Sequence, residues 1–248
     1  MSDILRETPA DGVLVLRLNR PKKLNALSND IVGDLGEMLA DAQVEGTRAV
    51  IIAGDARAFA AGADLDEFLE EGPLLAAWDV IWRCELPMIA AVRGIAFGGG
   101  LELAMSCDLM VVAQDARLGQ PEIKLGLIPG AGGTQRLTRA LGKTLATELI
   151  MLGGEISGQV AYDRGLANRC VPSERVEATA LDLATAIAAG APLAMRAAKR
   201  AITHAFEDGL RTSLERERAI FFELLETDDG REGVSAFRER RPAKWTGR

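Results

Sequence analysis

Residues 91–112 read AVRGIAFGGGLELAMSCDLMVV, and this stretch decides the fold. An apolar run leads into the glycine triplet Gly98 to Gly100, a helix-compatible segment follows, and a second apolar run closes the stretch. Strands that alternate with helices indicate an α/β fold with mostly parallel strands. Four short apolar runs are the predicted strands: residues 13–18, 49–54, 88–94 and 109–113.

Helices are predicted elsewhere along the chain. We expect one over residues 27–43, with Ser28 or Asn25 as its cap, and a later one over residues 142–152. Between about residues 174 and 240 glycines become sparse, and apolar residues recur at helical spacing in three segments.

This change of composition divides the chain. We expect a core with the active site over residues 1–190 and a helical region over residues 191–248, which packs on the core or on another subunit. Three glycines are interpreted as breaks between the helices of this part of the chain: Gly190, Gly209 and Gly230.

Composition excludes several classes of partner. The chain has 248 residues, 48% of them hydrophobic, and a formal net charge of −7 at pH 7. An acidic surface does not attract nucleic acid or anionic membranes, which bind clustered Lys and Arg. We therefore expect neither among the partners.

The cysteines and the first residues indicate a compartment. Cys84, Cys107 and Cys170 form no C-x-x-C pair and lie in apolar contexts, so free thiols are expected and a metal site is not. No apolar run reaches about 18 residues, and the start lacks the basic and apolar regions of a signal peptide. We expect a cytoplasmic protein.

Three features that resemble catalytic motifs are incomplete. The one histidine, His204, lies among Lys and Arg in a helical segment, and no serine stands in a G-x-S-x-G motif, so a triad has little support. We interpret His204 as structural. GAGGTQ at 130–135 has Gln135 where a dinucleotide fingerprint needs its third glycine. GKT at 142–144 lacks the partner glycine of a phosphate loop and is interpreted as a helix start.

Two glycine-rich turns remain, and each precedes a helix. One is AFAAGADLDEF at 58–68, and the other contains the triplet Gly98 to Gly100. A helix N-terminus presents unpaired N–H groups that stabilise an anion or a developing oxyanion. The two turns together could supply two donors to one carbonyl oxygen, although an isolated triplet is also explained by tight turns and close packing.

Two glutamates accompany these turns. Glu102 falls about one turn into the helix after the triplet, among apolar neighbours, and Glu122 follows Pro121. A carboxyl group among apolar groups tends to keep its proton, which suits acid or base catalysis. Taken singly, each glutamate is equally explained as an acid at the start of a helix, and both explanations stay open.

The sequence resembles the crotonase superfamily, and most closely the enoyl-CoA hydratases. Five blocks that span nearly the whole chain occur in the family's order and spacing. They are LNRPKKLNALS (18–28), FAAGADLDEF (59–68), AVRGIAFGGGLELAMSCDLMVV (91–112), GQPEIKLGLIPGAGGTQRL (119–137) and EGVSAFRERRPAKWTGR (232–248). The resemblance implies a crotonase-like α/β spiral of ββα units with a C-terminal helical trimerisation region, assembled as a trimer or a dimer of trimers.

The resemblance also implies site residues. The oxyanion hole for the thioester carbonyl falls on the backbone N–H groups of Ala63 and Gly99. The implied contacts to coenzyme A and substrate are Ala61, Ala63, Asp64, Leu65, Asp66 and Gly99. A further contact is implied for the CoA phosphates, at Lys22 or Lys23, with a solvated loop charge as the alternative. Lys244 and Trp245 are implied to reach a neighbouring subunit's CoA site.

In the implied reaction, Glu102 deprotonates the water that attacks C3, and Glu122 delivers a proton to C2. Whether one glutamate performs both steps stays open. The substrate is a trans-2-enoyl-CoA thioester, and no metal or further cofactor is implied because coenzyme A is part of the substrate. The alternatives are another reaction of the superfamily, such as isomerisation or dehydration, or a non-catalytic CoA-thioester- or RNA-binding module.

Two pairs of residues bear on the acyl group. Asp66 and Phe68 stand where many hydratases have a basic residue and a methionine, so contacts at the pocket rim are expected to differ. Trp78 and Trp82 lie in a segment that is expected to border the acyl pocket, with a place in the core as the alternative for both.

Overall fold

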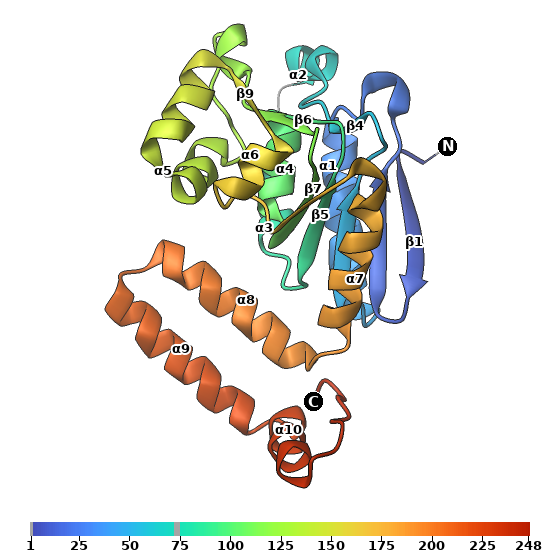
Figure 1. Cartoon of the computed structure of the whole chain (residues 1–248), viewed down its shortest axis with the longest axis vertical. Helices are drawn as coiled ribbons and strands as arrows, with labels where there is room; N and C mark the ends of the chain where they lie inside the picture. The colour runs from blue at the N-terminus through green and yellow to red at the C-terminus, as the bar shows by residue number, and fades with distance from the viewer. Residues whose placement is uncertain (1, 72–74) are drawn as a thin grey trace.

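The computed structural model describes residues 2–71 and 75–248 as a mixed α/β fold (Figure 1). The strands are β1 (Ile4–Ala10), β2 (Val13–Leu18), β3 (Ala49–Ala53), β4 (Ala58–Ala60), β5 (Met88–Val92), β6 (Ile95–Phe97), β7 (Leu109–Ala113), β8 (Arg117–Gly119), β9 (Glu155–Ser157) and β10 (Arg169–Val171). The α-helices are α1 (Asn29–Val44), α2 (Leu65–Glu71), α3 (Leu75–Trp82), α4 (Gly99–Ser106), α5 (Gly133–Leu152), α6 (Gly158–Asp163), α7 (Val176–Ala188), α8 (Pro192–Glu207), α9 (Leu210–Leu225) and α10 (Asp228–Glu239). Three 3₁₀ turns complete them: η1 (Pro21–Lys23), η2 (Glu122–Leu125) and η3 (Ser173–Arg175).

The strands form two sheets that share a repeating unit. One sheet has the order β1-β2-β3-β5-β7-β10, and the other has the order β4-β6-β8-β9. Each of the pairs β3–β4, β5–β6 and β7–β8 gives its first strand to the larger sheet and its second to the smaller one, and a helix or 3₁₀ turn follows. This repeat is the expected spiral of ββα units.

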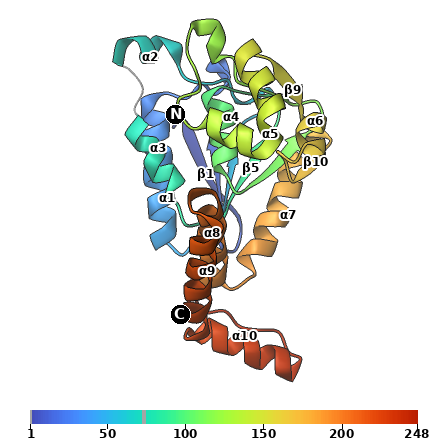
Figure 2. The ribbon, with the colours of Figure 1, turned by 90° about the vertical axis from the view of Figure 1, so that its left-hand side faces the viewer.

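The four predicted strands are confirmed as β2, β3, β5 and β7, and they pair in parallel with one another. Every residue of β3 and β5 is buried, as expected for parallel strands covered on both faces. In Figure 2 the larger sheet lies between α1 and α3 on one side and α7 on the other. The antiparallel pairs, β1–β2 and β8–β9, lie at sheet edges.

Helix predictions were right in type and less accurate in their bounds. Ser28 is the cap of α1, since its hydroxyl accepts the N–H of Ile31. The helix expected over residues 142–152 begins earlier, at Gly133, and is kinked at Gly142, which has a φ of 76° and ψ of 162°.

The prediction that Gly230 breaks a helix was wrong. Gly230 lies in the first turn of α10, where its N–H donates to the Thr227 hydroxyl at 2.9 Å. A glycine is tolerated there because the Thr227 cap, and not the glycine, defines the helix start. The breaks at Gly190 and Gly209 are confirmed, since both lie between helices.

Helices α8, α9 and α10 project away from the sheets, whereas α7 packs on the larger sheet (Figure 1). Each of the three projecting helices buries only one or two residues: Ala197 in α8, Ile220 in α9, and Asp229 and Ala236 in α10. The domain boundary at residue 190 stays a prediction. Among the described residues no single helix is long and apolar enough to cross a membrane; η3–α7 and α8 meet the length and composition limits only as a pair bent by 110°.

Candidate active site

The two glycine-rich turns lie beside each other. Strands β4 and β6 pair in parallel, so the turns that follow them leave the sheet at the same edge. A Cβ added to Gly99 would lie 3.7 Å from the backbone nitrogen of Ala63. The N–H groups of Ala63 and Gly99 donate no hydrogen bond within the described part of the chain. Two backbone donors are therefore available at one place.

The loop after β2 holds the first turn in position. The N–H of Leu27 donates to the Gly62 carbonyl at 2.7 Å, and its own carbonyl accepts the N–H of Asp64 at 2.8 Å. Asn25 is fully buried, and its amide donates to the Ala58 carbonyl at 2.9 Å. Because these bonds flank Ala63, they fix the direction of its N–H.

Asp64 is occupied by an ion pair. Its buried carboxylate accepts hydrogen bonds from Lys23 Nζ at 2.7 Å and from Arg20 Nη2 at 3.0 Å. The hydrogen bond from Lys23, followed by that from Arg20, lowers the pKa of Asp64, although burial opposes them. The side chain thus ties the turn to the preceding loop, and Lys23 is engaged in the same pair.

The other residues implied at coenzyme A are more open. Ala61 donates its N–H to the Leu24 carbonyl at 3.0 Å. Leu65 is exposed at the start of α2, and the side chain of Asp66 is 92% exposed, 3.7 Å from Lys23 Nζ. Lys22 is exposed. These side chains form an accessible rim beside the two donors.

Glu102 is a buried carboxyl group with two backbone donors. It projects from α4 and is 3% exposed. Its Oε1 atom accepts the N–H of Ala131 and the N–H of Gly133, each at 2.7 Å. Burial raises the pKa of Glu102 above its ordinary value, although the two donors and the positive charge of Arg136 oppose this shift. The donors thus favour the carboxylate in a place where burial alone would keep it protonated.

Glu122 has a different environment. Burial is the main cause that raises its pKa to about 7, and the charge of Glu102 raises it further. In the amide orientation that gives its nitrogen an acceptor, the fully buried Gln120 donates to Glu122 Oε1 at 2.8 Å and to Oε2 at 3.0 Å. Near neutral pH, Glu122 therefore exchanges a proton readily, beside a second carboxyl group that is held as an acceptor.

The glycine triplet joins these parts. Gly98 has a φ of +51°, and a Cβ there would lie 3.0 Å from Glu122 Oε1. A Cβ on Gly100 would lie 2.2 Å from the Ala60 carbonyl oxygen, so a side chain is excluded where α4 meets β4. The triplet is thus required by close packing, and this packing places Gly99 between the first turn and the glutamates.

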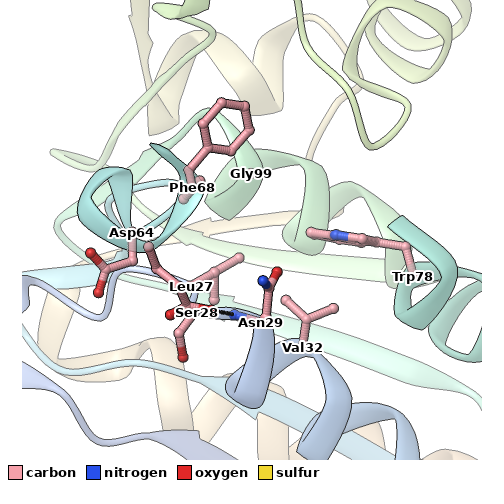
Figure 3. Close-up of a pocket in the computed structure, with 10 residues that line it drawn as sticks. Leu27, Ser28, Asn29, Val32, Asp64, Phe68, Trp78 and Gly99 are labelled. Carbon is pink, nitrogen blue, oxygen red and sulfur yellow. Dashed lines mark hydrogen bonds between the residues drawn. The ribbon is translucent and has the colours of Figure 1, made fainter. Parts of the chain in front are cut away.

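A small pocket adjoins the donors. Leu27, Val32, Phe68 and Trp78 contribute apolar surface to it, and Ala63 and Gly99 lie at its edge. In Figure 3 the carboxylate of Asp64 points to the side opposite Trp78. Trp78 is both buried and part of this lining, whereas Trp82 is 38% exposed and stacks on Arg136.

Comparisons with known proteins show the family of this chain. A family model described as enoyl-CoA hydratase/isomerase matches residues 8–248. The chain belongs to this family. Its members are enzymes, and their CoA-thioester chemistry implies a CoA-thioester substrate here. The chain is 43% identical to the 2,3-dehydroadipyl-CoA hydratase of Escherichia coli over 246 residues, 95% of this chain and 96% of that protein.

Further relatives support the family and its fold. A probable enoyl-CoA hydratase of Mycobacterium tuberculosis is 40% identical over 242 residues and is matched over 94% of both chains. The crystal structure of enoyl-CoA hydratase from Bacillus anthracis superposes with a TM-score of 0.94 at 36% identity, covering 100% of each chain. The crotonase fold expected from the sequence is thus confirmed.

For this enoyl-CoA hydratase/isomerase family member, sequence reasoning missed several residues of the site. GAGG at 130–133 was noted only as an incomplete dinucleotide fingerprint, yet Ala131 and Gly133 supply the donors to Glu102. The signal was available, because small residues before a helix leave N–H groups accessible. Gln120 and Arg136 carried no such signal, since their roles depend on contacts with other elements.

The remaining predicted residues lie elsewhere. His204, in α8, has its ring beside Arg216, Glu207 and Asp208. Trp245 packs against Gly233, and the N–H of Lys244 donates to Glu232 at 2.9 Å. The three cysteines are free thiols. Within residues 2–71 and 75–248, no three His, Cys, Asp or Glu side chains gather in a way that could hold a metal ion.

Proposed function

We propose that the protein adds water across the 2,3 double bond of trans-2-enoyl-CoA thioesters to give 3-hydroxyacyl-CoA. The observation that carries this proposal is the pair of carboxyl groups beside two unpaired backbone donors. Glu102 is held by two backbone donors, and burial raises the pKa of both carboxyl groups, that of Glu122 to about 7. The addition of H and OH to one double bond requires a base and an acid, and two carboxyl groups in different surroundings can divide these roles.

The donors act on the thioester. In the proposed complex the carbonyl oxygen accepts the N–H groups of Ala63 and Gly99. Charge moves onto that oxygen when water attacks C3, and donors fixed in advance stabilise the resulting enolate. Removal of one such donor in other enzymes costs about 3–4 kcal/mol of transition-state stabilisation.

The two glutamates then divide the proton transfers. Glu102 accepts a proton from the attacking water, whose oxygen bonds to C3. Glu122 gives its proton to C2 as the enolate collapses. Transfer of the proton from Glu102 to Glu122 then returns both carboxyl groups to their starting protonation states. Because the two carboxyl groups influence one another, a pH profile reports the pair and not either residue alone.

Loss of the enoyl-thioester absorbance of crotonyl-CoA on addition of protein tests the proposal. We expect Glu102→Gln and Glu122→Gln each to lower kcat by about 100-fold or more, while binding of saturated butanoyl-CoA, measured by calorimetry, persists. Glu37→Gln, an exposed glutamate on α1, is the matched control. If no enoyl-CoA in a panel from crotonyl-CoA to 2,3-dehydroadipyl-CoA is hydrated, the proposal is wrong. The ratio of kcat/KM across this panel measures acyl preference.

We further propose that the protein is a homo-oligomer, a trimer or a dimer of trimers. The proposal is supported by the large apolar side chains that the projecting helices leave exposed. They include Ile202, Phe206, Leu210, Leu214, Phe221, Phe222 and Leu225. Many large apolar side chains exposed on neighbouring helices are typical of subunit interfaces.

A further inference from the structure

We propose that Arg136 is a positioning residue for Glu102, and that it acts by holding the peptide group that lies between the two N–H donors of that carboxylate. The inference rests on the proposed hydration, in which Glu102 is the base. Arg136 is proposed to act through Glu102, so its test must distinguish a change in the position or charge around Glu102 from a general loss of activity.

The first step is the hydrogen bond to the backbone. Arg136 Nη1 donates to the carbonyl oxygen of Ala131 at 2.9 Å. That carbonyl belongs to the peptide joining Ala131 to Gly132. The N–H of Ala131 belongs to the preceding peptide and the N–H of Gly133 to the following one, and both donate to Glu102 Oε1. The ψ of Ala131 and the φ of Gly132, which flank the middle peptide, set the direction of one donor relative to the other, and the bond from Arg136 restrains both angles.

The backbone at Gly132 is shaped for this contact. Gly132 has a φ of +98°, which L side chains rarely adopt. A Cβ at this position would lie 2.1 Å from Arg136 Nη1. The guanidinium group thus occupies the space that any side chain at Gly132 would fill, so the left-handed turn and the arginine depend on each other.

The guanidinium is itself held on its other side. Its Cζ atom lies 5.0 Å from the centroid of the Trp82 ring, within the range of a cation–π contact. Trp82 Nε1 donates to Ser106 Oγ at 3.2 Å, and Ser106 Oγ donates to the Glu102 carbonyl oxygen at 2.8 Å. These contacts form a continuous network that links the Glu102 side chain, through α5 and α3, to the Glu102 main chain.

The positive charge of Arg136, like its hydrogen bond to the backbone, favours the ionised form of Glu102. The groups that face Glu102 are Arg136 on α5 and Glu122 on η2, and Arg136 lowers the pKa of Glu102. The groups that face Arg136, besides Glu102, are Cys107 and Arg139. Loss of the Arg136 charge therefore raises the pKa of Glu102, and a base with a raised pKa becomes active only at higher pH.

The test compares Arg136→Met with Arg136→Lys and with the control Arg139→Met. Arg139 lies on the same helix, and among the residues that the structure describes its side chain bonds only to Gln135. For Arg136→Met we expect kcat to fall about 10-fold or more with KM little changed, and the acid limb of kcat/KM to move to higher pH. Arg136→Lys, which keeps the charge, should return that limb toward its original position. Arg139→Met should leave kcat and the limb close to those of the unmodified protein.

A second measurement separates this inference from the proposed function. The carboxyl pKa of Glu102, followed by ¹³C NMR with the assignment made from Glu102→Gln, should rise in Arg136→Met even if no enoyl-CoA is hydrated. Trp82→Leu, which removes the stack but leaves the arginine, should give a smaller change of the same sign. If Arg136→Met does not fold, Trp82→Leu still carries the test. The inference is overturned if Arg136→Met, or Trp82→Leu in its place, has a pH limb and a Glu102 pKa that match those of Arg139→Met.

Discussion

The N–H of Gly133 lies 2.7 Å from Glu102 Oε1, so a glycine at the start of α5 holds a carboxyl group of α4. A Cβ on Gly133 would lie 3.0 Å from that oxygen and 2.7 Å from the Pro129 Cβ atom. The Gly133 N–H can thus reach Glu102 because this glycine has no side chain. The second donor, Ala131, lies two residues earlier on the same loop.

Gly133→Ala should lower kcat by about 10-fold or more, because the added methyl group displaces the Gln120 amide, Pro129 or the Glu102 carboxylate. Gly130→Ala is the control, since no atom of residues 2–71 or 75–248 outside its chain neighbours lies within 4 Å of a Cβ at Gly130. Steady-state hydration of crotonyl-CoA and thermal unfolding of both variants provide the comparison. Equal kcat values for the two variants would show that the position of the Glu102 carboxylate is not sensitive to this contact.

Glu122 should make the protein less stable as the pH rises. Its pKa is raised from the ordinary value of 4.5 to about 7, so between these values the folded state binds more protons than the unfolded state. Stability therefore falls as the pH rises from about 4.5 to about 7 and is not changed further by this group above that range. The melting temperature of Glu122→Gln relative to the unmodified protein should be higher at pH 8 than at pH 5. A difference that does not vary with pH would contradict the raised pKa.

Asp64→Asn should destabilise the fold by about 2 kcal/mol, because hydrogen bonds from Arg20 and Lys23 lose their ionised acceptor. The pKa of Asp64 is lowered, so its contribution to stability is present above its ordinary pKa and is lost as the pH falls through the lowered value. Asp66→Asn is the control, since the Asp66 side chain is 92% exposed. Urea unfolding at pH 7 gives the stability of both variants. Equal midpoints would show that the ion pair of Asp64 does not stabilise the turn.

Leu214→Glu combined with Phe221→Glu should dissociate the proposed oligomer, because charges would replace exposed apolar side chains of α9. The control is Val44→Glu, a residue 90% exposed at the end of α1. Light scattering after gel filtration gives the mass of each species. A monomeric unmodified protein, or a double variant of unchanged mass, would contradict the proposed interface.

Long-range contacts explain which elements were predictable. The buried strands β3, β5 and β7 were predicted because continuous apolar runs are a local signal. Strands β4, β6, β8 and β9 are three residues long, too short to show a period of two, and they form only when the ββα units stack. β1 is mostly exposed and contains Pro9, which is compatible with its edge position but weakens the strand signal.

The sequence by itself determined which residues could act as donors and acids. The triplet Gly98 to Gly100, the glutamates Glu102 and Glu122, and the order of the five motifs are local facts that indicate donors, acids and a family. Only the tertiary structure decided which groups meet. In the fold, the GAGG segment donates backbone N–H groups to Glu102, Asp64 accepts a hydrogen bond from Lys23, and Arg136 donates to the Ala131 carbonyl. The physical reason is that hydrogen bonds and burial act between elements far apart in the chain, and no local pattern records their geometry.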